Sequence, residues 1–459
     1  IMKLSKYFLP VLKDISSDAK IKSHQLMLRI GMIRQSSAGI YSWLPLGYKI
    51  LKKIEKVVRE EQDKSGAIEM LMPTIQSSEI WRESGRYESY GEEMLRIKDR
   101  QDRELLYGPT NEELITQLFR DNIKSYKSLP LMLYHIQWKF RDEIRPRFGI
   151  MRCREFLMKD TYSFDLSEED AQKTYFRMML CYLKTFQKLE LKAIPTKAET
   201  GPIGGDLSHE FIILADTGES EIYLNKDILN FDPSNLKYSE KSFSEVSNHY
   251  SIYYSATTEM HDKERFEKIT IKKSQMIKKG IEVGHIFYFG QKYSKPLNAI
   301  VNSKDGKNVN VYMGSYGIGV SRLVGAVIEA NYNNNIMKWP KSITPFHVAI
   351  INLGKKNDLI SKKAFKLYDE LLKNNFEVII DDTENNPSNK FKNFDLIGIP
   401  FQIIVGSKNK EEEFEFKELG KDLSLIHISE PTRQAEIAYG GVGVKKKRGG
   451  GGGGGGGGG

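Results

Sequence analysis

Hydrophobic residues follow a helical period along the stretch from Gly39 to Gly66. Apolar side chains recur every three or four positions, with lysines and glutamates between them, at Leu46, Ile50, Leu51, Ile54, Val57 and Val58. This spacing predicts an amphipathic helix that ends at Gly66, because glycine is frequent just beyond a helix C-terminus. The apolar run "IEMLM" (68–72) then predicts a short strand, which Pro73 closes.

Alternation with a period of two predicts a strand from Leu131 to Ile144. One face would carry the apolar residues Met132, Tyr134, Ile136, Trp138 and Phe140, and the other would carry Gln137, Lys139, Arg141 and Glu143. The loop "RPRFGI" is predicted to reverse the chain, and a return strand over 151–160 would place Arg152, Arg154 and Phe156 on a common face. The pattern therefore predicts a hairpin that presents arginines, a glutamate and an aromatic ring to one space.

The rest of the chain divides into two regions. A helix capped by Ser167 is predicted over 165–193, and residues 205–330 mix strands with helices. Beyond a linker at Pro340–Pro345, strands and helices alternate as in a small α/β unit. The predicted strands are 346–352, 376–381 and 400–405, and the predicted helices are 357–374 and about 388–397.

The stretch "YGIGVSRLVGAVIEA" (316–330) predicts a strand that turns directly into a helix. A dinucleotide-binding turn of the form G-x-G-x-x-G would need a third glycine at position 322, where this chain has Arg322. No acidic residue follows at the expected distance in a βαβ unit. A Rossmann-type dehydrogenase is therefore the weakest of the alternatives.

Composition and charge limit the possible partners and cellular compartment of the protein only broadly. The formal net charge of +9 is compatible with a polyanionic partner without requiring one. With two cysteines, Cys153 and Cys181, the chain has neither a four-cysteine zinc site nor a disulfide framework, so a reducing compartment is expected. No apolar run approaches the roughly 20 residues that span a bilayer, and the first ten residues resemble neither a signal nor a transit peptide.

The charges of the predicted hairpin leave two interpretations open. Arg141, Glu143, Arg152 and Arg154 are either a solvated sheet face with cross-strand ion pairs or a site whose ligand neutralises them. Phe156 on the same face and Arg322 at a helix start favour a ligand. Guanidinium groups bind phosphate oxygens in a bidentate manner, so three phosphates and an adenine would satisfy this set.

These residues resemble the three signature motifs of class II aminoacyl-tRNA synthetases. The helix ending in "IEMLMP" (68–73) is similar to motif 1, "FRDE" (140–143) with Arg152 and Phe156 to motif 2, and "GIGVSR" (317–322) to motif 3. Over residues 4–421 the chain resembles prolyl-tRNA synthetases in particular. That resemblance is carried by "LPLGYKIL" (44–51), "WRESGRY" (81–87), "YGPTNEE" (107–113), "RPRFGIMRCREFLMKDTYSF" (145–164), "GGDLSHEF" (204–211), "EVGHIFYFG" (282–290) and "DLIGIPFQIIVG" (395–406).

The resemblance implies an α+β fold in two domains. A class II antiparallel sheet with flanking helices would occupy residues 1–343, and a small α/β anticodon-binding domain, expected to be truncated, would occupy 344–423. Residues 424–459 end in the run Gly449–Gly459 and resemble translated adapter sequence, so we expect a non-native disordered tail. The alternative interpretation of residues 424–459 is a basic tail that binds nucleic acid.

For the amino acid, the resemblance implies that Thr110 and Glu112 contact proline, that Arg141 holds its carboxylate with the α-phosphate, and that His285 lines its pocket. A secondary ammonium needs an anionic acceptor, which Glu112 would supply. From the residues alone, a helix cap at Thr110–Glu112 and a buried core histidine at His285 remain open.

For the nucleotide, the resemblance implies that Glu143 reads the adenine amine and that Phe156 stacks on the ring. Arg152 and Arg322 would bind the outer phosphates, while Gly317 and Gly319 would let the helix start lie close under the nucleotide. Arg141 and Arg322 would be the catalytic residues. ATP and Mg²⁺ are implied, although no residue is assigned as a metal ligand.

The implied activity is that of an ATP-dependent proline–tRNA ligase. Proline would attack the α-phosphate of ATP, and the 3′-hydroxyl of the terminal adenosine of tRNA(Pro) would then take the prolyl group. Lys390 and Lys392 would contact tRNA, with a solvated helix face as the alternative for each. The resemblance further implies a homodimer without membrane association, in the cytoplasm or an organelle matrix.

Two rival functions follow from the same residues. A catalytically inactive paralogue would act as a tRNA-binding or regulatory module, and a class II synthetase for another amino acid would need different residues at Thr110, Glu112 and His285. The short stretch at about 219–280 stands where many bacterial members carry an editing insertion. We therefore expect alanine mischarging and a separate editing protein.

Overall fold

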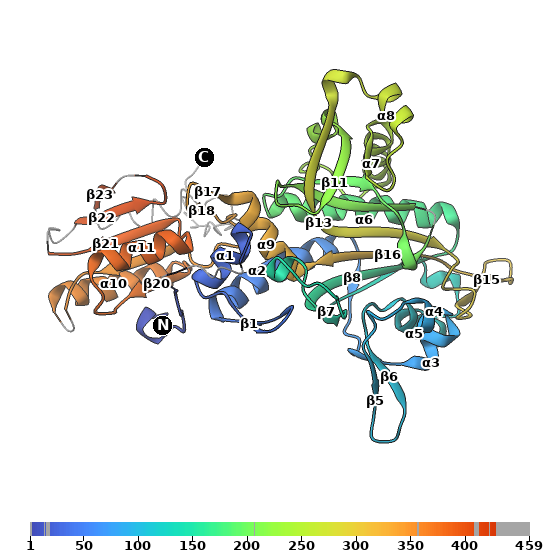
Figure 1. Cartoon of the computed structure of the whole chain (residues 1–459), viewed down its shortest axis with the longest axis horizontal. Coiled ribbons are helices and arrows are strands. Elements are labelled where there is room, and N and C mark those ends of the chain that lie inside the picture. Colours follow the sequence, from blue (N-terminus) through green and yellow to red (C-terminus); the bar gives the residue numbers. More distant parts are fainter. Residues whose placement is uncertain are drawn as a thin grey trace, which may run out of the picture. The chain divides into compact units, whose positions relative to one another are not determined.

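The computed structural model describes residues 2–12, 14, 19–205, 207–355, 358–407, 413–421 and 423–427. The chain forms two compact units (Figure 1), one of residues 8–345 and one in which residues 1–7 join the chain from Phe346 onward. The resemblance implied a first domain of residues 1–343, which would include residues 2–7. The structure pairs Lys3 with Ile380 instead, so this short segment belongs to the C-terminal unit.

The larger unit is built on a nine-stranded, mainly antiparallel sheet with the order β10-β9-β12-β11-β13-β16-β8-β7-β3. Its strands are β3 (Ile68–Glu69), β7 (Leu131–Phe140), β8 (Glu155–Asp165), β9 (Ala193–Lys197), β10 (Leu207–Leu214), β11 (Ser220–Asn225), β12 (Ser255–Thr257), β13 (Gln275–Gly290) and β16 (Tyr312–Gly319). The pairs β3–β7 and β9–β12 are parallel. The long central strands β7, β8, β16 and β13 form the platform that carries the site.

Helices cover this sheet and extend beyond it. They are α1 (Lys22–Arg29), α2 (Pro45–Lys64), α3 (Ser78–Glu83), α4 (Arg86–Ser89), α5 (Glu112–Asn122), α6 (Glu168–Lys188), α7 (Glu240–Ile252), α8 (Lys263–Ile269) and α9 (Val320–Asn331). Helix α6 runs along the sheet against β8, β13 and β16, while α9 packs on α2 and β8 (Figure 1). The rings of Phe119 on α5 and Phe164 on β8 stack with centroids 4.1 Å apart, which fixes α5 against the sheet.

Smaller elements complete this unit. The strands are β1 (Ile33–Ser37) with β2 (Ile40–Trp43), β4 (Ile75–Ser77) with β6 (Glu104–Tyr107) and β5 (Arg96–Lys98), β14 (Ile300–Asn302) with β15 (Asn308–Asn310), and β17 (Tyr332–Asn333) with β18 (Ile336–Met337). The 3₁₀ turns of this unit are Tyr126–Ser128, Gly149–Met151, Gly201–Ile203, Lys226–Asn230 and Lys272–Ser274; that of the smaller unit is Leu4–Lys6.

The helix predicted from Gly39 starts later than the pattern indicated. Residues 40–43 form β2, and α2 begins at Pro45, whose fixed φ and missing N–H suit the first helical turn. The predicted end is confirmed, with Ser65 as the C-cap and Gly66 at φ +87°. Helix α6 is shorter than the predicted 165–193, because residue 165 ends β8 and residue 193 begins β9. Its Ser167 cap is confirmed, since the Ser167 side chain accepts the backbone N–H of Asp170.

The predicted hairpin exists, but its strands are shorter than expected. Phe140 pairs with Glu155, so residues 141–154 all lie in the connection between β7 and β8. The prediction that Arg152, Arg154 and Phe156 share a strand face is wrong, because only Phe156 of the three lies on a strand.

The smaller unit has the alternating elements that the sequence predicted. They are β19 (Val348–Asn352), α10 (Leu359–Lys373), β20 (Val378–Asp381), α11 (Pro387–Ile397) and β21 (Phe401–Val405), followed by β22 (Glu413–Glu418) and β23 (Leu423–His427). The sheet order is β20-β19-β21-β22-β23, parallel around β19 and antiparallel beyond β21. Strand β23 crosses the predicted boundary at 423, and the tail predicted for 424–459 lies outside the described residues from 428 onward.

Candidate active site

One cavity of about 380 Å³ opens beside the central strands of the larger unit. Ten of the predicted site residues line it, although they come from five separate stretches of the chain: Thr110, Glu112, Arg141, Glu143, Arg152, Phe156, His285, Gly317, Gly319 and Arg322. The structure therefore brings the predicted amino-acid and nucleotide residues to one place. Lys390 and Lys392 belong to the smaller unit and do not line the cavity.

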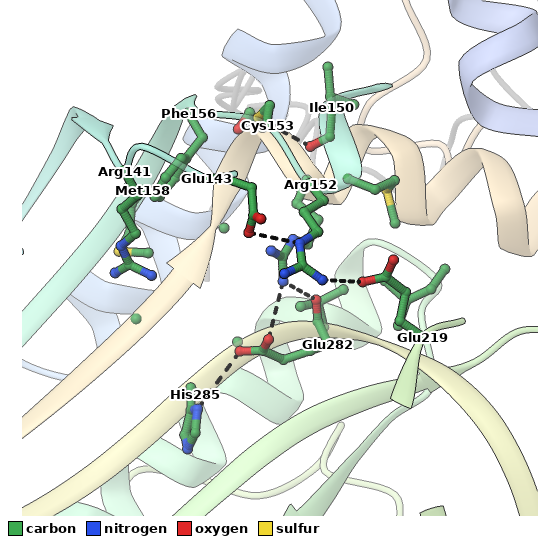
Figure 2. Close-up of a pocket in the computed structure, with 18 of the residues that line it drawn as sticks. Arg141, Glu143, Ile150, Arg152, Cys153, Phe156, Met158, Glu219, Glu282 and His285 are labelled. Carbon is green, nitrogen blue, oxygen red and sulfur yellow. Dashed lines mark hydrogen bonds and ion pairs between the residues drawn. The ribbon is translucent and has the colours of Figure 1, made fainter. Parts of the chain in front are cut away.

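The nucleotide side of the cavity is lined by ion pairs between arginines and carboxylates. Arg152 Nε donates to Glu143 Oε2 at 2.8 Å, and its Nη1 donates to Glu219 Oε2 at 3.3 Å (Figure 2). Arg147 Nε lies 2.6 Å from Glu219 Oε1. Burial of Glu143 opposes its ionisation, but the hydrogen bonds from Arg152 and from the Arg145 N–H outweigh burial, and the pKa of Glu143 is lowered.

Arg322 lies in the first turn of α9 and has a similar carboxylate partner. Its Nη1 donates to the backbone oxygen of Glu282 at 3.0 Å and to Glu282 Oε2 at 3.3 Å. Arg152 and Arg322 thus face the cavity from two elements, and each is paired with a carboxylate that phosphate oxygens would have to replace.

Arg141, the first residue of the β7–β8 connection, lies beside Phe156, the second residue of β8. The Arg141 guanidinium is 5.4 Å from the centre of the Phe156 ring, and its Nε and Nη2 both donate to the Pro109 oxygen at 3.3 Å. Arg154 points elsewhere: it pairs with Asp142 and lies over the Phe140 ring at 5.1 Å. Arg154 does not line the cavity, so the predicted set of arginines is smaller by one.

Gly317 and Gly319 form the floor where β16 runs into α9. Gly317 is paired with Asp160 of β8 and His285 of β13, which also line the cavity. A Cβ at Gly317 would meet only Met158 Sδ at 3.8 Å and the His285 oxygen at 3.9 Å, both ordinary contacts. Neither packing nor backbone conformation requires a glycine at position 317. The absence of a side chain therefore serves to leave space for a ligand in the cavity.

We expect Gly317→Ala to raise KM for ATP about tenfold while leaving the free energy of unfolding nearly unchanged, because the added methyl group takes up ligand space. Initial rates of ATP–pyrophosphate exchange at varied ATP would measure the effect. Urea unfolding of the same variant checks that its stability is unchanged. A Gly317→Ala enzyme with unchanged KM for ATP would show that the ligand does not approach this floor.

The amino-acid side of the cavity is centred on Glu112, the first residue of α5. Thr110 Oγ1 donates to Glu112 Oε2 at 2.6 Å, and Ser315 Oγ donates to Glu112 Oε1 at 3.1 Å. Asn111 is the N-cap residue, and no side chain caps the helix. The helix-cap interpretation of Thr110 is therefore wrong, because its hydroxyl orients a buried carboxylate and not a backbone N–H.

His285 lies at the edge of the same cavity. Its Nε2 is 2.6 Å from Ser208 Oγ, and its ring stacks on Phe287 with centroids 3.8 Å apart. Burial lowers the pKa of His285 to about 4, although Glu282 opposes this, so the imidazole is neutral near pH 7. The core-histidine interpretation is incomplete, since the ring is stacked and hydrogen-bonded but also lines the cavity.

Four acidic residues that line the cavity were missed by the sequence analysis, namely Glu93, Asp160, Glu219 and Glu282, and the last two pair with its arginines. Glu219 comes from the turn before β11, 67 positions from Arg152, and no local pattern marks it. Glu282 stands three residues before His285 in the quoted stretch "EVGHIFYFG", a spacing that puts two residues of a regular strand on opposite faces. The register shift opposite Phe211 and Ile212 inserts Val283, which brings Glu282 to within 3.8 Å of His285.

The prediction that Lys390 contacts tRNA is wrong. Its side chain is buried, and Nζ donates to the backbone oxygens of Asn352 at 2.7 Å and Thr383 at 2.6 Å, beside Asp381 at 3.5 Å. Lys390 therefore ties α11 to β19 and β20. Lys392, two residues later on the same helix, is exposed.

Lys390→Met is expected to lower the free energy of unfolding by about 3–5 kcal/mol, because it leaves Asp381 and three carbonyl groups buried without their cation. Lys392→Met is the matched control on the same helix and should change it by no more than about 0.5 kcal/mol. Urea unfolding followed by circular dichroism would measure both. Equal stability of the two variants would contradict the structural role of Lys390.

Comparison with known proteins identifies the family. Residues 95–331 match the tRNA synthetase class II core domain (G, H, P, S and T), and residues 347–430 match an anticodon binding domain. The proline–tRNA ligase of Pelagibacter ubique is 59% identical over 435 residues, which cover 94% of this chain and 98% of that protein. The proline–tRNA ligase of Hyphomonas neptunium is 57% identical over 412 residues, 90% of this chain and 94% of that protein.

Two solved structures share the fold at low identity. The prolyl-tRNA synthetase of Giardia lamblia, in complex with prolyl-adenylate, aligns with a TM-score of 0.70 and 19% identity over 90% of this chain and 78% of that one. The enzyme of Cryptosporidium parvum, with L-proline and AMP, aligns with a TM-score of 0.71 and 16% identity over 93% of this chain and 77% of that one.

The fold and the matched core domain make this chain a class II aminoacyl-tRNA synthetase. Within that class, it belongs to the proline–tRNA ligase family. Among the described residues, none of the helices has the length and apolar character needed to cross a membrane.

Proposed function

We propose that the cavity binds L-proline and ATP, forms prolyl-adenylate, and delivers the prolyl group to the 3′ end of tRNA(Pro). The observation that carries this proposal is the convergence of a buried glutamate and three arginines, Arg141, Arg152 and Arg322, on one cavity. A cationic amino acid group and a polyphosphate are the two chemistries that this set complements.

Glu112 is proposed to accept the secondary ammonium of proline. Its two oxygens already have fixed directions through Thr110 and Ser315, so the carboxylate is oriented before the substrate arrives. The stacked rings of His285 and Phe287 supply an uncharged wall for the proline ring. Arg141 donates to the backbone oxygen of Pro109, next to Thr110, and is proposed to hold the substrate carboxylate there.

For the nucleotide, Glu143 is proposed to read the adenine amine and Phe156 to stack on the ring. Arg152 and Arg322 bind the outer phosphates, and Arg141 bridges the proline carboxylate and the α-phosphate. A carboxylate oxygen of proline attacks the α-phosphorus, a new P–O bond forms, and pyrophosphate leaves with the electrons of the broken P–O bond. The fixed guanidinium groups stabilise the negative charge that develops on the phosphate oxygens.

Mg²⁺ fits the carboxylates on the nucleotide side of the cavity. Glu219 and Glu282 face the phosphate-binding arginines, and a hard oxygen-preferring cation suits such donors. When bound, Mg²⁺ would neutralise phosphate charge alongside Arg152 and Arg322. In the second step, the 3′-hydroxyl of the terminal adenosine attacks the prolyl carbonyl carbon, and AMP leaves.

The smaller unit is proposed to bind the anticodon, with Lys392 as one phosphate contact. A homodimer is proposed because β3 lies at the edge of the sheet and its neighbourhood exposes apolar side chains, with Ile68 57% and Leu71 73% exposed. A Leu71→Asp variant that sediments as the same species as the parent would contradict this interface. The cytoplasm or an organelle matrix, where tRNA and ATP are present, is the proposed location.

The direct test is ATP–pyrophosphate exchange by the full chain with proline, alanine and threonine compared. Exchange that requires proline, followed by transfer of labelled proline to tRNA(Pro), is expected. A folded protein that binds ATP without proline-dependent exchange would favour the inactive paralogue.

We expect this enzyme to attach alanine to tRNA(Pro) and to leave it attached, which would require a separate editing protein. A pocket for proline cannot strongly reject a smaller side chain, since each methylene is worth about 10–200-fold in discrimination. Residues 219–280 hold β11, β12 and the start of β13 from the main sheet, together with α7, α8 and two 3₁₀ turns. Incubating the pure protein with preformed alanyl-tRNA measures this, and steady hydrolysis would overturn the expectation.

A further inference from the structure

Behind the amino-acid side of the cavity, one buried cation lies between two buried carboxylates. Arg86 Nη1 is 3.0 and 3.2 Å from the two oxygens of Glu113 and 3.3 Å from Glu112 Oε2. The side chains of Arg86, Glu112 and Glu113 are 5%, 1% and 0% exposed. Arg86 and Glu113 do not line the cavity, so they act on a ligand only through Glu112.

Aromatic rings hold the Arg86 guanidinium in place. Its carbon lies 5.0 Å from the centre of the Trp81 ring, 5.5 Å from that of Tyr90 and 5.3 Å from that of Tyr293. Within the described part of the chain, Nε and Nη2 of Arg86 have no hydrogen-bond partner. All hydrogen bonds of this cation therefore go to the two carboxylates, through one nitrogen, while the rings fix its position.

The charges in this cluster do not balance. Two carboxylates face one guanidinium, and the buried Lys139 near Glu112 is already matched by Asp160 at 3.0 Å. Lys292 is exposed and its Nζ donates to the backbone oxygen of Ile203 at 2.7 Å, and Arg141 lines the cavity. With both glutamates ionised, one negative charge remains, and Glu112 is the member of the pair that reaches the cavity.

We propose that Glu113 and Arg86 set the charge of the proline subsite: Arg86 is a positioning residue for Glu112, and Glu113 engages Arg86 so that Glu112 keeps a negative charge for the substrate ammonium. This inference rests on the proposed role of Glu112. Glu113 and Arg86 would therefore affect recognition of the positive charge on the ring nitrogen, and not recognition of the shape of the ring.

The cluster also predicts how proline binding depends on pH. Burial raises the pKa of Glu113 to about 7, while Arg86 opposes the rise and Glu112 adds to it. The other groups that face Glu113 are the Ser84 hydroxyl, which donates to it at 2.9 Å, the phenols of Tyr90 and Tyr293, and exposed Lys292. Below about pH 7 Glu113 takes up a proton and becomes neutral, so the charge of Arg86 is then balanced by Glu112 alone. The subsite loses its net negative charge, and KM for proline rises. Above about pH 7 Glu113 is ionised, and KM for proline is at its lowest.

The test compares the full-length wild type with Glu113→Gln in proline-dependent ATP–pyrophosphate exchange between pH 6 and 8. We expect Glu113→Gln to raise KM for proline about tenfold at pH 8, to leave KM for ATP unchanged, and to remove the pH dependence of KM for proline. Tetrahydrofuran-2-carboxylate has the same ring with an ether oxygen in place of the ammonium. Its inhibition constant should not change, because it carries no cation for Glu112 to bind.

Matched variants separate positioning from simple damage. Arg86→Lys should retain more proline affinity than Arg86→Gln, since it keeps the charge, and Glu240→Gln on the exposed first turn of α7 should behave as wild type. Should Glu113→Gln fail to fold, Ser84→Ala, which removes one hydrogen bond to Glu113, is expected to shift the rise in KM for proline to higher pH. Equal losses for proline and tetrahydrofuran-2-carboxylate, or an unchanged pH profile, would overturn the inference. A wild-type enzyme without proline-dependent exchange would instead contradict the proposed function.

Discussion

Replacing Arg322 with alanine is expected to lower the rate of proline-dependent ATP–pyrophosphate exchange by about 100- to 1,000-fold, the usual effect of removing one fixed group that stabilises transition-state charge. Arg322 is half-buried on the first turn of α9, its guanidinium faces the cavity, and its carboxylate partner Glu282 comes from the facing strand. Its removal leaves the phosphates with Arg141 and Arg152 alone, which come from the β7–β8 connection.

The matched control for this experiment is Arg154→Ala. Arg154 also belongs to the β7–β8 connection and is paired with one carboxylate, Asp142, but it does not line the cavity. The exchange rate of Arg154→Ala should stay within about twofold of wild type, as for a surface change remote from the chemistry. Similar losses in both variants would mean that general positive charge, and not the position of Arg322, supports the reaction.

Replacing Glu112 with glutamine should have its largest effect on proline. We expect KM for proline to rise by about 30- to 1,000-fold, which corresponds to about 2–4 kcal/mol for a buried charge-assisted interaction that loses its anion. KM for ATP should change by less than about threefold, because the nucleotide residues lie on other elements. Steady-state exchange at varied proline and at varied ATP separates the two constants.

Glu240→Gln is again the control, since Glu240 is exposed in the first turn of α7 whereas Glu112 is buried in the first turn of α5. Thr110→Val provides a graded comparison, because it removes one hydrogen bond to Glu112 and keeps the carboxylate. Parallel increases in KM for ATP and for proline after Glu112→Gln would place Glu112 outside the amino-acid site.

The carboxylates that face the arginines explain how the site is stable without its ligand. Arg152 is held by Glu143 and Glu219, and Arg322 is held by Glu282, so each of the two arginines proposed for the outer phosphates has a carboxylate partner in the cavity. Phosphate groups that enter must displace at least the contacts with Glu219 and Glu282. This exchange of one anion for another keeps each partly buried guanidinium paired with an anion, both with and without ligand.

Local sequence determined the elements whose signals lie within a few residues. The cap at Ser167, the stop at Gly66 and the alternating strands and helices from β19 to β21 all follow from periodicity and capping chemistry. The motif residues were also found from sequence, because their side-chain chemistry and order along the chain are local properties. Their convergence on one cavity was an expectation that rested on resemblance.

Only the tertiary structure decided which charges meet. Arg154 pairs with Asp142 because both residues lie in the connection that ends one residue after Arg154, where β8 starts. Lys390 is buried because carbonyl groups of β19 and of the β20–α11 loop converge on α11. Glu219 contacts Arg152 although the two residues are 67 positions apart in sequence. Glu282 faces His285 through an irregularity in strand register that no alternating pattern contains. The physical reason is that periodicity reports how one element buries a face, whereas the partner of a charged group depends on contacts between elements far apart in sequence.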